Sequence, residues 1–124
     1  MTTFEFTIDD LAEVRSLARR AAAGTDLAEQ VAVAVSELAS NAIRHGGGRG
    51  VLTIAPVPGG VRVEVRDWGP GLARGVPTEA PKQLAYGGRG LWIVSKLFPQ
   101  FVLESSPTGV TASVLLHTPA APNP

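Results

Sequence analysis

The segment ELASNAIRHG, residues 37–46, decides the fold. Apolar residues in and just before it recur at a spacing of three or four, as on the buried face of an amphipathic helix: Leu27, Val31, Val35, Leu38 and Ala42. Glu37, Asn41 and His45 follow one another at intervals of four, so they share a second, polar face of the same helix. We therefore expect one helix, ending near His45, with both a core face and a polar stripe.

The polar stripe has two interpretations. An asparagine inside a helix is mildly unfavourable, and a bound ligand would explain its presence. A stripe of polar residues is equally typical of the solvated outer face of an amphipathic helix. His45 has its own alternative, because a histidine at a helix C-terminus interacts favourably with the helix dipole without binding anything.

The chain around this helix predicts the remaining elements. Alternation indicates a strand over residues 4–8, and Asp9 then stands where the N-cap of a first helix belongs. Gly24 ends that helix, and Asp26 can cap the second one. The later elements are a hairpin at residues 51–55 with 61–67, a third helix with apolar spacing over residues 91–98, and a closing strand pair at residues 101–104 with 110–116.

This order of elements predicts the fold class. Strand, two helices, hairpin, long loop, helix and hairpin together indicate an α+β protein, a two-layer sandwich. We expect a mixed, mostly antiparallel sheet covered on one face by about three helices. The length of 124 residues fits a single domain over residues 1–118, followed by a disordered tail, residues 119–124.

Composition excludes several classes of function. Eleven basic and eleven acidic side chains balance, so no strong field attracts nucleic acid or an anionic membrane. The chain has no cysteine and two histidines, which argues against disulfides and an all-protein zinc site. No apolar run is long enough to cross a bilayer and the start lacks signal-peptide features. We expect a cytoplasmic protein with neither nucleic acid nor membrane as partner.

A second motif is DWGPG, residues 67–71, directly after a predicted strand. A carboxylate at a strand end, here Asp67, can accept a hydrogen bond from an exocyclic amine. Gly69 and Gly71 let the main chain turn and approach a flat ligand. The same residue types also dominate ordinary tight turns, so the motif by itself leaves both interpretations open.

A third motif is GGRGL, residues 87–91, at the start of the third predicted helix. Free backbone amides at a helix start can bind phosphate, and glycines allow close approach. A flexible loop end is the alternative. The sequence contains neither a P-loop nor a complete GxGxxG pattern, so a phosphate here would be bound differently.

The three motifs lie, in this order, on a helix, at a strand end and at a helix start. In this arrangement they resemble the Bergerat-fold (GHKL) superfamily of gyrase, heat-shock chaperone, histidine kinase and mismatch-repair ATPases. Within it, the chain looks most like the small anti-sigma-factor serine/threonine kinases, over essentially its whole length. The resemblance implies that ATP and Mg²⁺ are the cofactors. It also implies that Glu37 is the general base and that Asn41 coordinates the metal.

The same resemblance assigns the other nucleotide contacts. Asp67, with Gly69 and Gly71, would recognise adenine, and Thr111 would support the adenine site from a late strand. Gly88, Gly90 and Leu91 would end a phosphate-covering lid over residues 72–90. Three basic residues would neutralise phosphate charge: Arg44, His45 and Arg89.

The resemblance implies a kinase that binds a sigma factor and phosphorylates an antagonist protein, and it makes a homodimer an expectation. A non-catalytic, nucleotide-gated binding protein and a switch kinase acting on a scaffold protein are alternatives. A histidine kinase catalytic domain is a further one, although we expect no phosphoacceptor helices before Phe4. Arg15, Arg19 and Arg20 form either a docking patch for an acidic partner or a solvated helix face.

Overall fold

The structure, a computed structural model, describes residues 1–71 and 88–117, with the backbone alone for residues 88 and 89. Its strands are β1 (Thr2–Phe6), β2 (Gly50–Val57), β3 (Gly60–Arg66), β4 (Val102–Ser106) and β5 (Gly109–His117). Its helices are α1 (Leu11–Ala21), α2 (Ala28–His45) and α3 (Gly88–Leu97), with a short 3-10 turn, η1 (Ile8–Asp10), before α1.

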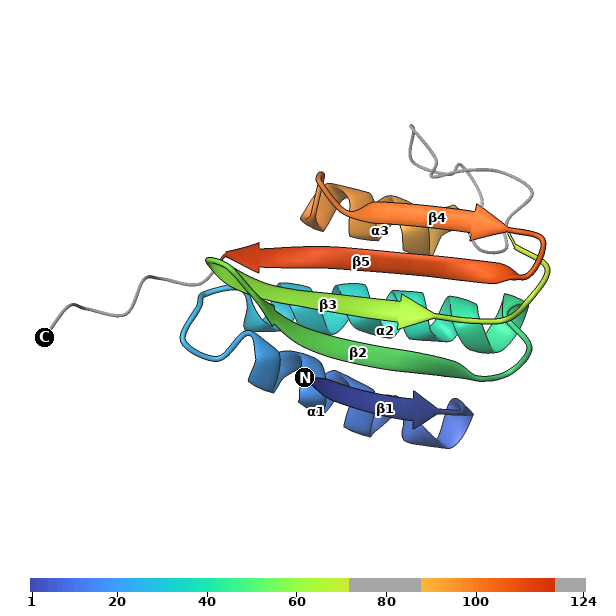
Figure 1. The fold of residues 1–124 in the computed structure, drawn as a ribbon, viewed down its shortest axis with the longest axis horizontal. Coiled ribbons are helices and arrows are strands. Elements are labelled where there is room, and N and C mark those ends of the chain that lie inside the picture. Colours follow the sequence, from blue (N-terminus) through green and yellow to red (C-terminus); the bar gives the residue numbers. More distant parts are fainter. Residues whose placement is uncertain (72–87, 118–124) are drawn as a thin grey trace, which may run out of the picture.

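The strands form one sheet in the order β1-β2-β3-β5-β4. Every neighbouring pair in it is antiparallel. The three helices lie together on one face of this sheet, with α2 between α1 and α3 (Figure 1). The predicted α+β sandwich is confirmed.

Helix α2 lies at the centre of the helical layer because its sequence supplies two kinds of buried side chain. Large apolar ones fill the core, and small ones let neighbouring elements pack closely. Val31, Val35 and Leu38 are buried in the core together with Val63 and Val65 of β3. Four small residues of α2 are buried as well, and their size lets the neighbouring elements pack closely: Ala32, Ala34, Ala39 and Ala42. The helix that carries Glu37 and Asn41 is therefore fixed against the sheet.

Alternation along the strands divides the sheet into two faces. The covered face buries side chains of β3 and β5 against the helices: Val63, Val65, Ala112, Val114 and Leu116. The other face carries no helix in the described part of the chain (Figure 1). Arg62, Glu64 and Arg66 of β3 project there, paired across the sheet with Leu115, Ser113 and Thr111 of β5. We call this surface the open face.

Two predicted helix caps differ from the structure. Asp9 was expected to cap the first helix, but the chain forms η1 there, and the Asp10 carboxylate accepts bonds from Thr7 N (2.9 Å) and Thr7 Oγ1 (3.3 Å). Asp26 was expected to cap the second helix. The Thr25 hydroxyl orders that turn instead, accepting from Leu27 N (3.1 Å) and donating to the Ala22 carbonyl (2.7 Å). Threonine hydroxyls compete with aspartate for such local bonds.

Some sequence expectations fall outside the described residues. These are the disordered tail at residues 119–124 and most of the expected lid, residues 72–87. The boundary of a single domain at residue 118 stays a prediction. Within residues 1–71 and 88–117, no helix has the length and apolar character needed to span a bilayer.

Candidate functional site

Four elements far apart in sequence meet at one end of the molecule: the last turns of α2, the end of β3, the start of α3 and the β4–β5 turn (Figure 1). A cavity of about 20 Å³ lies among them on the covered side of the sheet. Asn41 and Asp67 both line it. Two residues that the sequence singled out on separate elements thus contribute to one cavity.

Asp67 is the buried charged residue of this site, with a relative exposure of 7%. Its Oδ1 accepts hydrogen bonds from the backbone N–H groups of Gly69 (3.1 Å) and Val110 (3.0 Å). The Asp67 N–H in turn donates to the Val110 carbonyl (2.9 Å). These bonds fix the carboxylate at the strand end, and Oδ2 has no hydrogen-bond partner among the described residues. A ligand amine can donate to that oxygen.

Glycines allow the backbone to pack tightly around Asp67. A Cβ at Gly46, just after α2, would overlap the Asp67 side chain. A Cβ at Gly69 would overlap the His45 carbonyl and Gly46, and one at Gly109 would overlap the Asp67 carbonyl. The lack of a side chain at Gly69 therefore allows close contact between the Asp67 turn and the end of α2, and its role in ligand approach stays a prediction.

Asn41 supplies an unsatisfied polar group to the same cavity. Its Nδ2 is buried and has no hydrogen-bond partner among the described residues. Leaving a buried donor unpaired costs about 1–3 kcal/mol, so such groups are usually satisfied by a ligand, an ion-bound water or a protein acceptor. This unpaired donor is a second cost of the asparagine, in addition to its low helix propensity.

Glu37 lies one helical turn before Asn41 and faces the start of α3. A Cβ placed on Gly90 would lie 2.7 Å from Oε2 of Glu37 and 3.6 Å from Nδ2 of Asn41. The absence of a side chain at Gly90 therefore lets the first turn of α3 approach both residues. Gly88 belongs to the same turn, whereas the side chain of Arg89 lies outside the described part.

The cavity walls are apolar, and sequence reasoning missed most of them. Leu91 was named for the site, and it lines the cavity together with residues taken as core or given no role: Leu38, Val65, Leu103, Val110 and Ala112. Apolar walls around a few fixed polar groups are typical of small-molecule sites. The sequence offered one signal for Val65. It lies two residues before Asp67, so its side chain points to the same side of the sheet.

The structure does not bring every predicted residue into this cavity. Thr111 projects from the open face, where it lines a different hollow, and its neighbours Val110 and Ala112 line the cavity in its place. Arg44 is exposed on α2. His45 contributes its carbonyl to the contact with Gly69. Gly71 has φ +84°, and a Cβ there would overlap the Ser106 carbonyl, so it shapes the turn beside β4.

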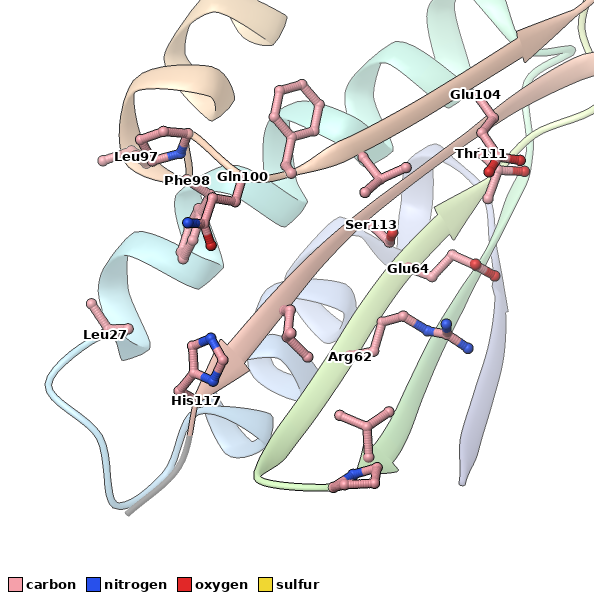
Figure 2. A pocket seen from close by; sticks show the side chains of 16 residues that line it. Leu27, Arg62, Glu64, Leu97, Phe98, Gln100, Glu104, Thr111, Ser113 and His117 are labelled. Carbon is pink, nitrogen blue, oxygen red and sulfur yellow. The ribbon is translucent and has the colours of Figure 1, made fainter. Parts of the chain in front are cut away.

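A second, wider hollow lies away from this chemistry. It holds about 800 Å³ on the open face and reaches from Thr111 to His117 and Leu27 at the opposite end of the molecule (Figure 2). Figure 2 shows Arg62, Glu64 and Ser113 projecting into it from β3 and β5. It contains neither Asn41 nor Asp67. We base the site on the fixed and unsatisfied polar groups, because size alone does not define a chemical function.

The fold and the site define a class, an α+β sandwich with a small cavity between a helix and the end of an antiparallel strand. The model of the histidine kinase-like ATPase domain family matches residues 4–115, and the chain belongs to that family, within the GHKL superfamily. Membership supports an ATP-binding function of kinase or ATPase type.

A solved structure shows the same fold. The catalytic domain of the histidine kinase ThkA, in a nucleotide-free form, is similar over 95% of this chain and 98% of its own, with 22% identity and a TM-score of 0.56. A search of curated proteins gave no match to this chain.

Proposed function

We propose that this protein is a Mg²⁺- and ATP-dependent protein serine/threonine kinase of the anti-sigma-factor type. It would bind a sigma factor and phosphorylate an antagonist protein, in the cytoplasm. The observation that supports this most directly is the position of the Glu37 carboxylate against the first turn of α3 at Gly90. The N-terminus of a helix can bind phosphate through its free backbone N–H groups. A carboxylate beside it can accept the proton of an attacking hydroxyl.

The residues around the cavity fit the two cofactors. Asp67 offers Oδ2 to the exocyclic amine of adenine between apolar walls, and Asn41 has an unsatisfied buried amide next to the expected phosphate position. The described residues contain no cluster of three acidic, histidine or cysteine side chains that could hold a metal alone. Mg²⁺ suits such a site, since it is often held by one or two protein oxygens together with phosphates and water. The carboxamide oxygen of Asn41 would be that ligand.

The cavity must widen to admit a nucleotide. Its volume of about 20 Å³ is far below the roughly 300–1,000 Å³ of typical small-molecule pockets. Leu91 and Leu103 line it from α3 and β4, at the side of the sheet farthest from β1. Movement of α3 relative to α2 would enlarge the cavity while leaving Asp67 fixed by its own strand.

The test separates transfer from binding. Glu37→Gln keeps the size of the side chain but removes the base, so the affinity for Mg·ATP should stay within about twofold while transfer falls by roughly 100-fold or more. Calorimetry measures the first quantity, and transfer of label from γ-labelled ATP to a candidate antagonist protein measures the second. Glu64→Gln, on the open face, is the matched control and should change neither.

Each result has a defined meaning. Unchanged transfer in Glu37→Gln removes the assigned base and the kinase proposal with it. Binding of ATP without transfer by the wild-type protein favours the nucleotide-gated binding protein, and transfer to a scaffold protein but not to an antagonist favours the switch kinase. Sedimentation with and without ATP tests the expected homodimer.

A further inference from the structure

Trp68 follows Asp67 in the chain but lies on the other side of the sheet. It is 43% exposed, which is unusual for so large an apolar side chain. The guanidinium groups of Arg49 and Arg66 lie over its ring, at 5.4 Å and 5.3 Å from the ring centroid. We call these three residues the Arg-Trp-Arg cluster.

The cluster follows from strand register. Val51 of β2 pairs with Arg66 of β3, so Arg49 and Trp68 occupy the next positions beyond the two strand ends. Side chains two residues apart on a strand share a face. Arg66, Trp68 and Arg49 therefore gather at the end of the open face, at the same end of the molecule as Asp67 and Asn41.

In the described part of the chain, no carboxylate forms an ion pair with the cluster. Among residues 1–71 and 88–117, ion pairs join Arg19 to Glu29 and Arg20 to Glu13, and none involves Arg49 or Arg66. The cross-strand neighbours of Arg66 are the uncharged Val51 and Thr111. Two like charges thus share one ring, in a chain whose total charge is zero. An anion placed between them would relieve their repulsion.

The tryptophan also prepares the arginines for binding. Stacking over an aromatic ring occupies the flat face of a guanidinium but leaves its N–H edge free for a bidentate contact with a carboxylate. Long side chains held in place lose less conformational freedom when a partner binds. Trp and Arg are, in addition, among the residue types enriched at the centres of protein interfaces.

We propose that the Arg-Trp-Arg cluster is a docking site for an acidic segment of a partner protein, whose carboxylates bind Arg49 and Arg66. A hollow of about 290 Å³ lies beside Arg66, and Asp67 lines it together with the uncharged Ser106, Thr108 and Thr111. Glu104 also lines that hollow, across Thr111 from Arg66. The negative charges of Glu104 and Asp67 would repel an acidic segment from the hollow, so the segment would bind on the Arg49 side of the cluster. The inference rests on the proposed function only in taking the partner to be the protein that is phosphorylated.

The test uses the full chain without nucleotide and a dye-labelled peptide of six glutamates as the probe. We expect it to bind more tightly than a peptide of six glutamines. Arg49→Gln combined with Arg66→Gln should weaken binding by about tenfold or more, since two charge-assisted contacts are lost. Arg62→Gln is the matched control, because Arg62 is an exposed arginine of the same strand and face (Figure 2), and it should change binding by less than twofold.

A second variant tests the role of the ring. Trp68→Leu keeps both charges but removes the stack, so it should weaken glutamate binding by a few-fold. Mg·ATP affinity and the circular dichroism spectrum should stay unchanged in all these variants, because the cluster lies on the face opposite the cavity. If the wild-type protein did not bind ATP, the proposed kinase function would be wrong. Binding of the glutamate peptide would still test the docking site, because it is measured without nucleotide.

Three results would overturn the inference. One is the absence of any glutamate-peptide binding at low salt. Another is equal weakening by Arg62→Gln, which would indicate unspecific charge attraction. The third is tighter binding of a single-stranded oligonucleotide of equal charge than of the peptide, which would assign the cluster to nucleic acid.

Discussion

In the proposed function, Asp67 is the single residue on which recognition of the base would depend most. In Asp67→Asn the side-chain oxygen can still accept from Gly69 N and Val110 N, but the charge that strengthens both bonds is gone. We expect a loss of about 1–3 kcal/mol in the free energy of unfolding. Replacing the free Oδ2 by an amide that donates should lower ATP affinity by about tenfold or more.

Urea unfolding and calorimetry measure these two effects. Asp26→Asn is the control, because Asp26 is exposed between the first two helices and should affect neither quantity. If Asp67→Asn bound ATP as the wild-type protein does, the carboxylate would have only a structural role.

Single residues also show how far sequence could locate the site. Asp67 and Asn41 could be found because each stands out locally: Asp67 is a carboxylate followed by glycines at a strand end, and Asn41 is a residue that is mildly unfavourable inside a helix. Thr111 could not be placed in the same way. Whether it or its neighbours Val110 and Ala112 face the cavity depends on the strand's alternation, which is set where Gly109 packs on Asp67. Gly109 and Asp67 are 42 positions apart in the sequence, so no local sequence pattern reveals their contact.

At the scale of elements, two glycines at the site should respond differently to the same substitution. Gly69→Ala would drive a Cβ into the backbone at the end of α2, which cannot yield cheaply, so we expect a loss of about 1–3 kcal/mol in stability. Gly90→Ala meets the tip of the flexible Glu37 side chain instead. Stability should change little, whereas phosphoryl transfer should fall by about tenfold as the carboxylate is displaced.

Urea unfolding of both variants, with the transfer assay for Gly90→Ala, checks this contrast. Gly59→Ala, in the β2–β3 turn with φ +77° and open space around it, controls for backbone strain alone and should cost about 1 kcal/mol. Equal destabilisation by Gly69→Ala and Gly90→Ala would mean that α3 packs on α2 as rigidly as the Asp67 turn does.

The elements themselves were largely predictable. Apolar spacing gave α2, and the turn at Pro58 and Gly59 gave the β2–β3 hairpin. The order of the sheet was not predictable from either pattern. In the sequence β4 precedes β5, yet in the sheet β5 lies next to β3 and β4 is the edge strand. This arrangement depends on α3 packing beside α2, a contact between segments that each look complete when considered alone.

For the whole molecule, the sheet separates two surfaces that meet at one end. Asp67 and Trp68 are consecutive, but one side chain faces the cavity under the helices and the other faces the open side. A strand of alternating side chains can thus hold a nucleotide on one face and a protein partner on the other. Both would lie at the end of β3, so a docked chain would lie beside Asp67, on the base side of the proposed nucleotide site.

The stability of the whole domain should report how the nucleotide is held. A ligand that binds only the folded state at 100 times its dissociation constant adds about 2.7 kcal/mol, which for a domain of this size corresponds to a rise of about 10 °C in Tm. We expect that rise with Mg·ATP by calorimetric melting. With ATP and EDTA the rise in Tm should be smaller, because Asn41 would no longer share a metal with the phosphates. In Asn41→Ala, the Tm with Mg·ATP should equal the Tm with ATP and EDTA. Adenosine should give a small rise that EDTA does not change, since Asp67 binds the base without metal. A rise with adenosine equal to that with Mg·ATP would show that the first turn of α3 and Asn41 contribute nothing to the phosphates, and the assigned phosphate side of the site would be wrong.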